Sequence, residues 1–186
     1  MRTYRRLFIP GATYFFTLVT HQRLPLLSDA EAVGRWHSAV RAVQRKMPFA
    51  VEGEVVLPDH LHLLWQLPEG DADYPNRLRL VKSAFTRATV AARCSPAIVS
   101  ASRAAKGEQA VWQRRYWEHT IRDERDFQTH LDYIHINPVR HGLVAAAQDW
   151  PYSTFREWVA RGVYEPWWGS SDMPPMPDWV DRCDKP

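Results

Sequence analysis

Stretches rich in β-branched and aromatic residues occur at four places along the chain, and each predicts a β-strand. The predicted strands cover residues 14–20, 49–57, 60–67 and 113–119. Apolar residues three or four positions apart predict helices at 29–46, 76–93 and 123–136. Asp29 is placed to cap the first helix. Asn137-Pro138 is expected to end the third, because the residue before a proline is disfavoured in helical geometry. The inner side of the second helix is assigned to Leu80, Ala84 and Ala88.

This order of elements predicts an α+β, ferredoxin-like fold. It has an antiparallel sheet, flanking helices and an extra C-terminal helix. We expect one domain at 1–148, with a flexible loop of small and polar residues at 94–110. An aromatic-rich tail follows at 149–186, and part of it can form a short helix. Docking of its tryptophans on the domain is favoured, because large aromatic residues are usually buried. Stacking on nucleic-acid bases and partial disorder remain alternatives.

Charge is distributed unevenly along the 186 residues, which carry a net charge of +3. Residues 165–186 hold five acidic and two basic residues, which leaves 22 basic and 16 acidic residues in the rest. A basic, aromatic-rich body is compatible with a nucleic-acid partner, although the value is ordinary. No stretch approaches the ~18 apolar residues of a membrane span, and no signal peptide is indicated. Two cysteines without a pairing motif favour a cytoplasmic protein.

His60-Leu61-His62 carries the first chemical signal. Side chains alternate between the two faces of a strand, so both histidines are expected on one face and Leu61 on the other. Two imidazoles side by side can bind a divalent metal ion. The pattern alone leaves open that each ring only makes a local hydrogen bond.

The third predicted helix carries a tyrosine close to further polar residues. Phe127, Leu131 and Ile134 form its buried stripe, with His130, Tyr133 and Asn137 on the flank. If this helix covers the histidine face, two imidazoles and an amide oxygen bind a cation that polarises a phosphodiester. The tyrosine hydroxyl then attacks phosphorus. A free tyrosine has a pKa near ~10, so nearby cations must favour the phenolate. The candidates for this role are Lys82, Arg87 and Arg122.

Four motifs resemble those of known proteins. His60-Leu61-His62 is similar to the His-hydrophobic-His motif of the HUH single-strand nucleases. The stretches at 115–119, 132–143 and 150–155 resemble the REP-associated tyrosine transposases, in the same order, over about residues 4–168.

The resemblance implies a ferredoxin-like sheet that carries the histidines and a later helix that carries the tyrosine. It implies cleavage and rejoining of single-stranded DNA beside repetitive extragenic palindromes (REP) folded as hairpins. By position, His60 and His62 are metal ligands and Tyr133 is the nucleophile. Asn137 takes the third ligand position, where related insertion-sequence transposases carry Gln. One candidate tyrosine implies a mechanism with a single nucleophile, which leaves a 5′-phosphotyrosine and a free 3′-hydroxyl. Mg²⁺ and Mn²⁺ are the expected metals, because such a site leaves positions open for phosphate oxygens.

Basic residues outside these motifs are candidates to hold the hairpin backbone, and each can equally be a solvated surface charge. These candidates are Arg5, Arg6, Arg77, Arg79, Lys82, Arg114 and Arg115.

Two other readings stay open. A nucleotide hydrolase of the histidine-triad kind requires a third histidine where this chain has Leu64. A non-catalytic module on the same fold would bind hairpins without cleaving them. The sequence also leaves open whether a monomer or a homodimer is the working form, since insertion-sequence relatives place the tyrosine across a dimer.

Overall fold

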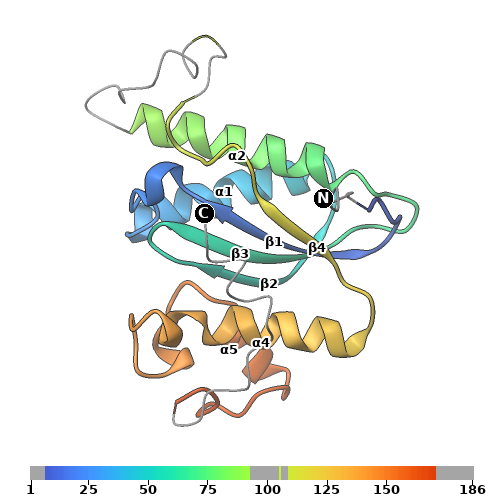
Figure 1. Cartoon of the computed structure of the whole chain (residues 1–186), viewed down its shortest axis with the longest axis vertical. Helices are drawn as coiled ribbons and strands as arrows, with labels where there is room; N and C mark the ends of the chain where they lie inside the picture. The colour runs from blue at the N-terminus through green and yellow to red at the C-terminus, as the bar shows by residue number, and fades with distance from the viewer. Residues whose placement is uncertain (1–6, 93–104, 106–108, 171–186) are drawn as a thin grey trace, which may run out of the picture.

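A four-stranded antiparallel sheet separates two helical layers (Figure 1). The computed structural model describes residues 7–92, 105 and 109–170. The strand order is β2-β3-β1-β4, which confirms the ferredoxin-like α+β prediction. The strands are β1 (Thr13–Val19), β2 (Ala50–Val56), β3 (His60–Gln66) and β4 (Trp117–Thr120). The helices are α1 (Ala30–Gln44), α2 (Tyr74–Ala91), α4 (Glu124–Arg140) and α5 (Phe155–Ala160). Short 3-10 turns lie at His21–Arg23 and Ala147–Asp149.

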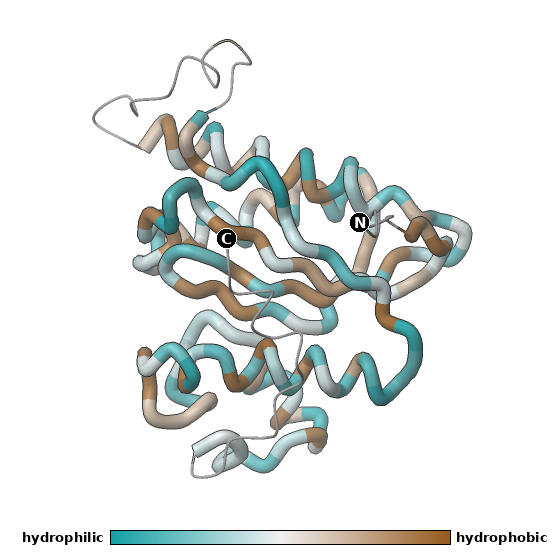
Figure 2. The backbone as a smooth tube through the Cα atoms, viewed as in Figure 1, coloured by the Kyte–Doolittle hydropathy of each residue, from teal (hydrophilic) through white to brown (hydrophobic). Residues whose placement is uncertain are grey.

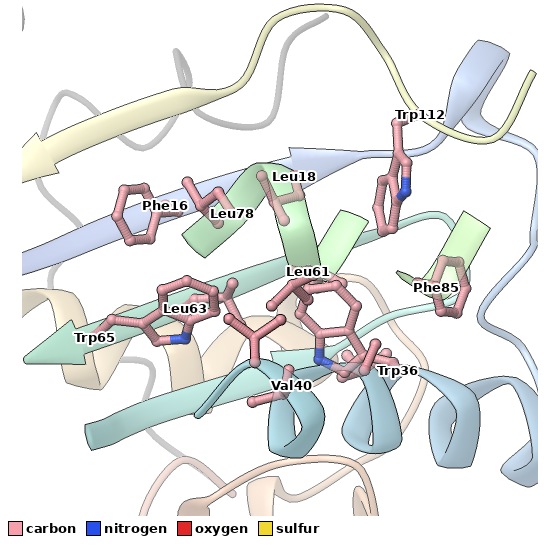
Figure 3. Packing of buried hydrophobic residues seen from close by; sticks show 14 of the residues in the cluster. Phe16, Leu18, Trp36, Val40, Leu61, Leu63, Trp65, Leu78, Phe85 and Trp112 are labelled. Carbon is pink, nitrogen blue, oxygen red and sulfur yellow. The ribbon is translucent and has the colours of Figure 1, made fainter. Parts of the chain in front are cut away.

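The two central strands are buried on both faces, so each reads as an almost continuous apolar run. Figure 2 shows apolar positions along the strands of the sheet. One face packs against α1 and α2 through a cluster that includes Phe16, Trp36, Leu61, Trp65 and Phe85 (Figure 3). The other face packs against α4, α5 and the chain that follows them. No described helix is long and apolar enough to cross a membrane.

Helix α2 is rotated relative to the prediction. Leu80 and Ala84 are only half-buried, whereas Leu78, Val81 and Phe85 are fully buried against the sheet. Two apolar stripes run along this helix, and the sequence does not show which one faces the sheet. Asp73 accepts a hydrogen bond from the Asn76 amide, so the helix begins two residues before the predicted start.

The predicted end of α4 was wrong, because the helix continues through Pro138 to Arg140. A proline inside a helix removes one hydrogen bond and crowds the preceding turn. Here Pro138 lies in the last turn, where the amide of His141 still bonds to the Asn137 carbonyl. Asn137 is therefore held inside a helix rather than at a frayed end.

Strand β4 is shorter than predicted and begins at Trp117. Trp117 pairs with Thr17 of β1, and the next pairing toward the loop joins Trp112 to Thr20. Two residues of β1 are thus opposed by the four residues 113–116. This stretch bulges out of the sheet.

Residues 149–170 pack against β2 and α4. The indole Nε1 of Trp150 donates to the Val56 carbonyl at 3.0 Å, and that of Trp158 donates to the Glu52 carbonyl at 2.7 Å. Phe155 and Tyr164 are buried between these elements. The boundary near residue 148 stays a prediction, and most of the predicted 94–110 loop and the tail beyond 170 lie outside the described residues.

Gly53 sets how closely α4 approaches the sheet. It lies at a register shift in β2, and a Cβ there would meet Leu131 Cδ1 at 3.0 Å and Ile134 Cδ1 at 3.1 Å. We expect Gly53→Ala to lower the free energy of unfolding by about 2 kcal/mol through overpacking. The control is Gly34→Ala in α1, where a Cβ meets nothing within 4 Å. It should raise stability by about 0.5–1 kcal/mol. Urea unfolding of both variants measures this, and equal stabilities would contradict it.

Candidate active site

Strand β3 carries His60 and His62 on the sheet face that α4 covers. Their ring centroids are 5.1 Å apart, and both side chains are buried. Leu61 and Leu63 point to the opposite face and join the cluster beneath α1 and α2. The alternation predicted from the sequence is therefore confirmed, and the apolar half of the strand anchors the histidine half.

His60 is oriented by the neighbouring Asp59. Its Nδ1 lies 2.5 Å from the Asp59 carboxylate, which also accepts a hydrogen bond from Arg23 at 3.0 Å. Burial alone would raise the pKa of Asp59, but the hydrogen bonds from His60 and Arg23 lower it to about 2. A carboxylate at Nδ1 leaves the lone pair on Nε2. That Nε2 is buried and has no hydrogen-bond partner among the described residues.

His62 connects the sheet to the tyrosine helix. Its Nδ1 lies 2.9 Å from Thr17 Oγ1 on β1, and its Nε2 lies 3.3 Å from the Tyr133 hydroxyl on α4. The Phe15 ring stacks on His62, with a centroid distance of 5.6 Å, and also contacts Tyr133. The proposed nucleophile and one proposed metal ligand are thus in direct contact within one chain.

Asn137 follows Tyr133 by four residues on α4, which places the two on the same side of the helix. Both are fully buried. Neither the amide oxygen nor the amide nitrogen of Asn137 has a hydrogen-bond partner in the described part of the chain. A buried amide without partners costs free energy unless a ligand satisfies it. His60 Nε2 and Asn137 are therefore the polar groups that fit a metal ion at this site.

Two residues near the site were missed because the helix was predicted to end too early. The Arg140 guanidinium lies 5.5 Å from the Tyr133 ring centroid, and the His141 ring lies 5.0 Å from that of His60. Seven residues make two helical turns, so a longer helix would have placed Arg140 beside Tyr133. The cations predicted for this role lie elsewhere: Lys82 and Arg87 are on α2, across the sheet, and Arg122 pairs with Asp126.

A second group of ligand-type side chains lies one turn before Tyr133. His119, Asp126 and His130 have ligand atoms within 4.8 Å of one another. The same Asp126 oxygen accepts from His119 at 2.8 Å and from Arg122 at 2.9 Å. Burial lowers the pKa of His130 to about 4, which keeps that ring neutral. Since Arg122 already brings a positive charge to Asp126, we interpret the group as a network that joins β4 to α4.

The predicted DNA-binding residues fall into three environments. Arg79, Arg114 and Arg115 are exposed, and Lys82 is half-buried beside a cleft. Arg5 and Arg6 lie outside the described residues. Arg77 requires a correction because its side chain is 1% exposed and pairs with both carboxylate oxygens of Asp71 at 2.9 and 2.6 Å. It also donates to the carbonyls of Met47 and Pro48. Its donors are used within the fold, so it is not available to a phosphate.

No family model matches the chain. A protein of Escherichia coli (strain K12) named REP-associated tyrosine transposase is 42% identical over 164 residues, which are 88% of this chain and 88% of the relative. A putative REP-associated tyrosine transposase of Haemophilus influenzae is 42% identical over 93% of this chain and 97% of the relative. A solved structure of such a transposase bound to a REP hairpin superposes with a TM-score of 0.75, at 40% identity over 95% of both chains.

The Asp59 contact predicts a measurable effect on metal binding. If His60 binds a metal ion, Asp59→Asn should weaken Mn²⁺ binding by about 10–100-fold, because the imidazole loses the carboxylate that orients it. Asp149→Asn, at an exposed aspartate, is the matched control and should leave binding unchanged. Calorimetric titration of both variants is the test, and equal affinities would rule out a metal at His60.

The structural role of Arg77 predicts a loss of stability rather than of DNA binding. Arg77→Ala should lower the free energy of unfolding by about 2 kcal/mol, because three carbonyls and the partly exposed Asp71 carboxylate lose a buried donor. Arg79→Ala, two residues away and exposed, should change it by no more than about 0.5 kcal/mol. Chemical denaturation compares the two, and a fully stable Arg77→Ala protein would refute this role.

Proposed function

The chain belongs to the family of REP-associated tyrosine transposases, and we propose that it is a metal-dependent endonuclease and transposase of single-stranded DNA. It cleaves and rejoins DNA at REP hairpins through a 5′-phosphotyrosine intermediate. The contact of 3.3 Å between the Tyr133 hydroxyl and His62 Nε2 carries this proposal, because it brings a nucleophile to the metal-ligand strand. Because its proposed substrate is DNA, we assign the protein to the cytoplasm.

His60, His62 and Asn137 are the residues that would hold the metal ion. The unpartnered His60 Nε2 and Asn137 amide support this assignment. Two imidazoles and one amide oxygen suit Mn²⁺ or Mg²⁺, and a bound ion supplies charge that polarises the scissile phosphodiester. Asp59 and Thr17 hold the two imidazoles at their Nδ1 atoms, which directs Nε2 of each ring toward the site.

Tyr133 acts as the nucleophile. Its oxygen forms a bond to phosphorus while the bond from phosphorus to the 3′ oxygen breaks. The products are a 5′-phosphotyrosine and a free 3′-hydroxyl, which reverses the step when strands are rejoined. The Tyr133 hydroxyl gives up its proton, and the leaving 3′ oxygen takes up a proton, so the step balances. The Arg140 guanidinium, 5.5 Å from the ring centroid, supplies positive charge beside the attacking oxygen. His62 and Tyr133 come from the same chain, so this chemistry does not require a second copy.

The hairpin is the proposed DNA partner because a relative with 40% identity was solved with a REP hairpin bound. Arg79 on α2 and the neighbouring Arg114 and Arg115 before β4 are exposed, which supports binding of the DNA backbone there. Arg5 and Arg6 remain candidates for the same role. Each phosphate contact releases counterions, so hairpin affinity should fall steeply with salt.

The alternative is a hairpin-binding module without catalysis. The His60 Nε2 and the Asn137 amide, which lack partners among the described residues, argue against it. Without a bound ligand these buried polar atoms would only destabilise the folded protein. The chemistry of Tyr133 distinguishes the two.

We expect Tyr133→Phe to abolish the covalent protein–DNA adduct while hairpin affinity stays within a few-fold of wild type. The loss of one hydroxyl removes the nucleophile and little of the binding surface. A labelled single-stranded REP hairpin is incubated with Mn²⁺, and denaturing electrophoresis detects the adduct. Tyr152→Phe is the matched control and should form it normally.

Residual adduct in Tyr133→Phe would assign the chemistry to another tyrosine. Tight hairpin binding without any adduct in the wild-type protein would favour the binding module.

A further inference from the structure

A cleft of about 680 Å³ lies between α2 and the bulged segment that leads into β4. In Figure 1 the chain before β4 runs beside α2. Arg79, Lys82 and Arg87 line the cleft from α2, and Trp112, Arg114 and Tyr116 line it from the other side. The size is that of pockets that hold small organic ligands rather than a lone inorganic ion.

Lys82 is the central cation of this cleft. Its Nζ lies 3.4 Å from the Gln113 carbonyl and 5.6 and 5.8 Å from the ring centroids of Trp112 and Tyr116. Burial lowers the pKa of Lys82 to about 8. None of the described residues that line the cleft is acidic. The ammonium group is thus partly desolvated, and none of the described residues that line the cleft gives it an anionic partner.

Charges removed from water in proteins are ordinarily paired, because desolvation of an unpaired ion is unfavourable. Here four cationic side chains line one cleft, and contacts with a carbonyl and two aromatic rings compensate Lys82 only in part. An anion placed beside Lys82 would offset the desolvation of its ammonium group. The aromatic side chains in the lining suit an anion that carries flat rings.

We propose that this cleft binds a phosphodiester of single-stranded DNA next to the hairpin, with Lys82 on the phosphate and Tyr116 beside the adjoining base. The identification of the anion as DNA rests on the proposed function. The cleft is distinct from the site around Tyr133, because α2 and α4 cover opposite faces of the sheet. Tyr116 packs toward the first face and Trp117 toward the second. A strand that passes the β4 edge can therefore reach both sites.

The test compares Lys82→Met with Lys46→Met, which removes an exposed lysine near the end of α1. The two probes are a REP hairpin with a single-stranded extension and an oligothymidylate of about ten nucleotides. We expect Lys82→Met to weaken the binding of both probes about tenfold and to lower the salt slope by about one. Lys46→Met should change neither. Lys82→Arg should restore affinity to within a few-fold.

A purely structural role for Lys82 would lower the unfolding temperature of Lys82→Met. A ligand-binding role predicts that Lys82→Met unfolds at the same temperature as wild type or higher, because the substitution removes a partly desolvated charge. Unchanged affinity of Lys82→Met for both probes, or a lowered unfolding temperature with unchanged affinity, overturns the subsite. Lys82-dependent binding of oligothymidylate by a protein that forms no Tyr133 adduct sustains the subsite and overturns the catalytic proposal. A covalent adduct formed by the wild-type protein, together with unchanged affinity of Lys82→Met for both probes, sustains the catalytic proposal and overturns the subsite. A wild-type protein that binds neither probe overturns both.

Discussion

The packing of α4 against the histidine face of the sheet determines how close Tyr133 and Asn137 lie to the two histidines. Gly53 allows Leu131 and Ile134 to approach β2 closely, and this contact sets the height of the helix above the sheet. Tyr133 belongs to the same helix, and its hydroxyl meets His62 only at this height. A helix fixed by apolar packing is a rigid support, since close-packed interiors deform little. The polar contact between helix and sheet is thus a consequence of an apolar one.

The surrounding polar groups on the same face of the sheet refine this placement. Thr17 on β1 is directly opposite His62 in the strand pairing, so register alone brings the hydroxyl to the imidazole. Asp59 precedes β3 and aligns His60. The network of His119, Asp126 and Arg122 fixes the start of α4 to the end of β4. Helix α4 is therefore held at its beginning by charge and along its length by packing.

Local patterns in the sequence predicted much of this, and tertiary constraints account for what they missed. The strands, the Asp29 cap and the shared face of His60 and His62 follow from periodicity and side-chain chemistry within a few residues. The orientation of α2 depends on which of two apolar stripes the sheet accepts, which no local pattern records. Arg77 appeared to be a surface cation for that reason. The extension of α4 past Pro138 concealed Arg140 and His141, because a proline near the last turn reads as a helix end. The proximity of Tyr133 to His62 was expected if the third helix covered the histidine face, and the resemblance implied the same arrangement. Thr17 could not be paired with His62 before the strand register was known.

The complete burial of Tyr133 has a consequence for the fate of a covalent intermediate. A phosphotyrosine retains the free energy of the phosphodiester it replaced, and the strand can be resealed only while that bond survives. Water that reached the phosphorus would discharge it and leave a permanent break in the DNA. An enclosed tyrosine excludes this competing nucleophile, in the way that closed active sites protect reactive intermediates from hydrolysis. The same enclosure requires the site to open before a strand can enter, so the frequency of opening would limit how often the chain cuts. If Tyr133 is the nucleophile that we propose, its burial would make the protein a slow nuclease that seldom leaves an unrepaired end.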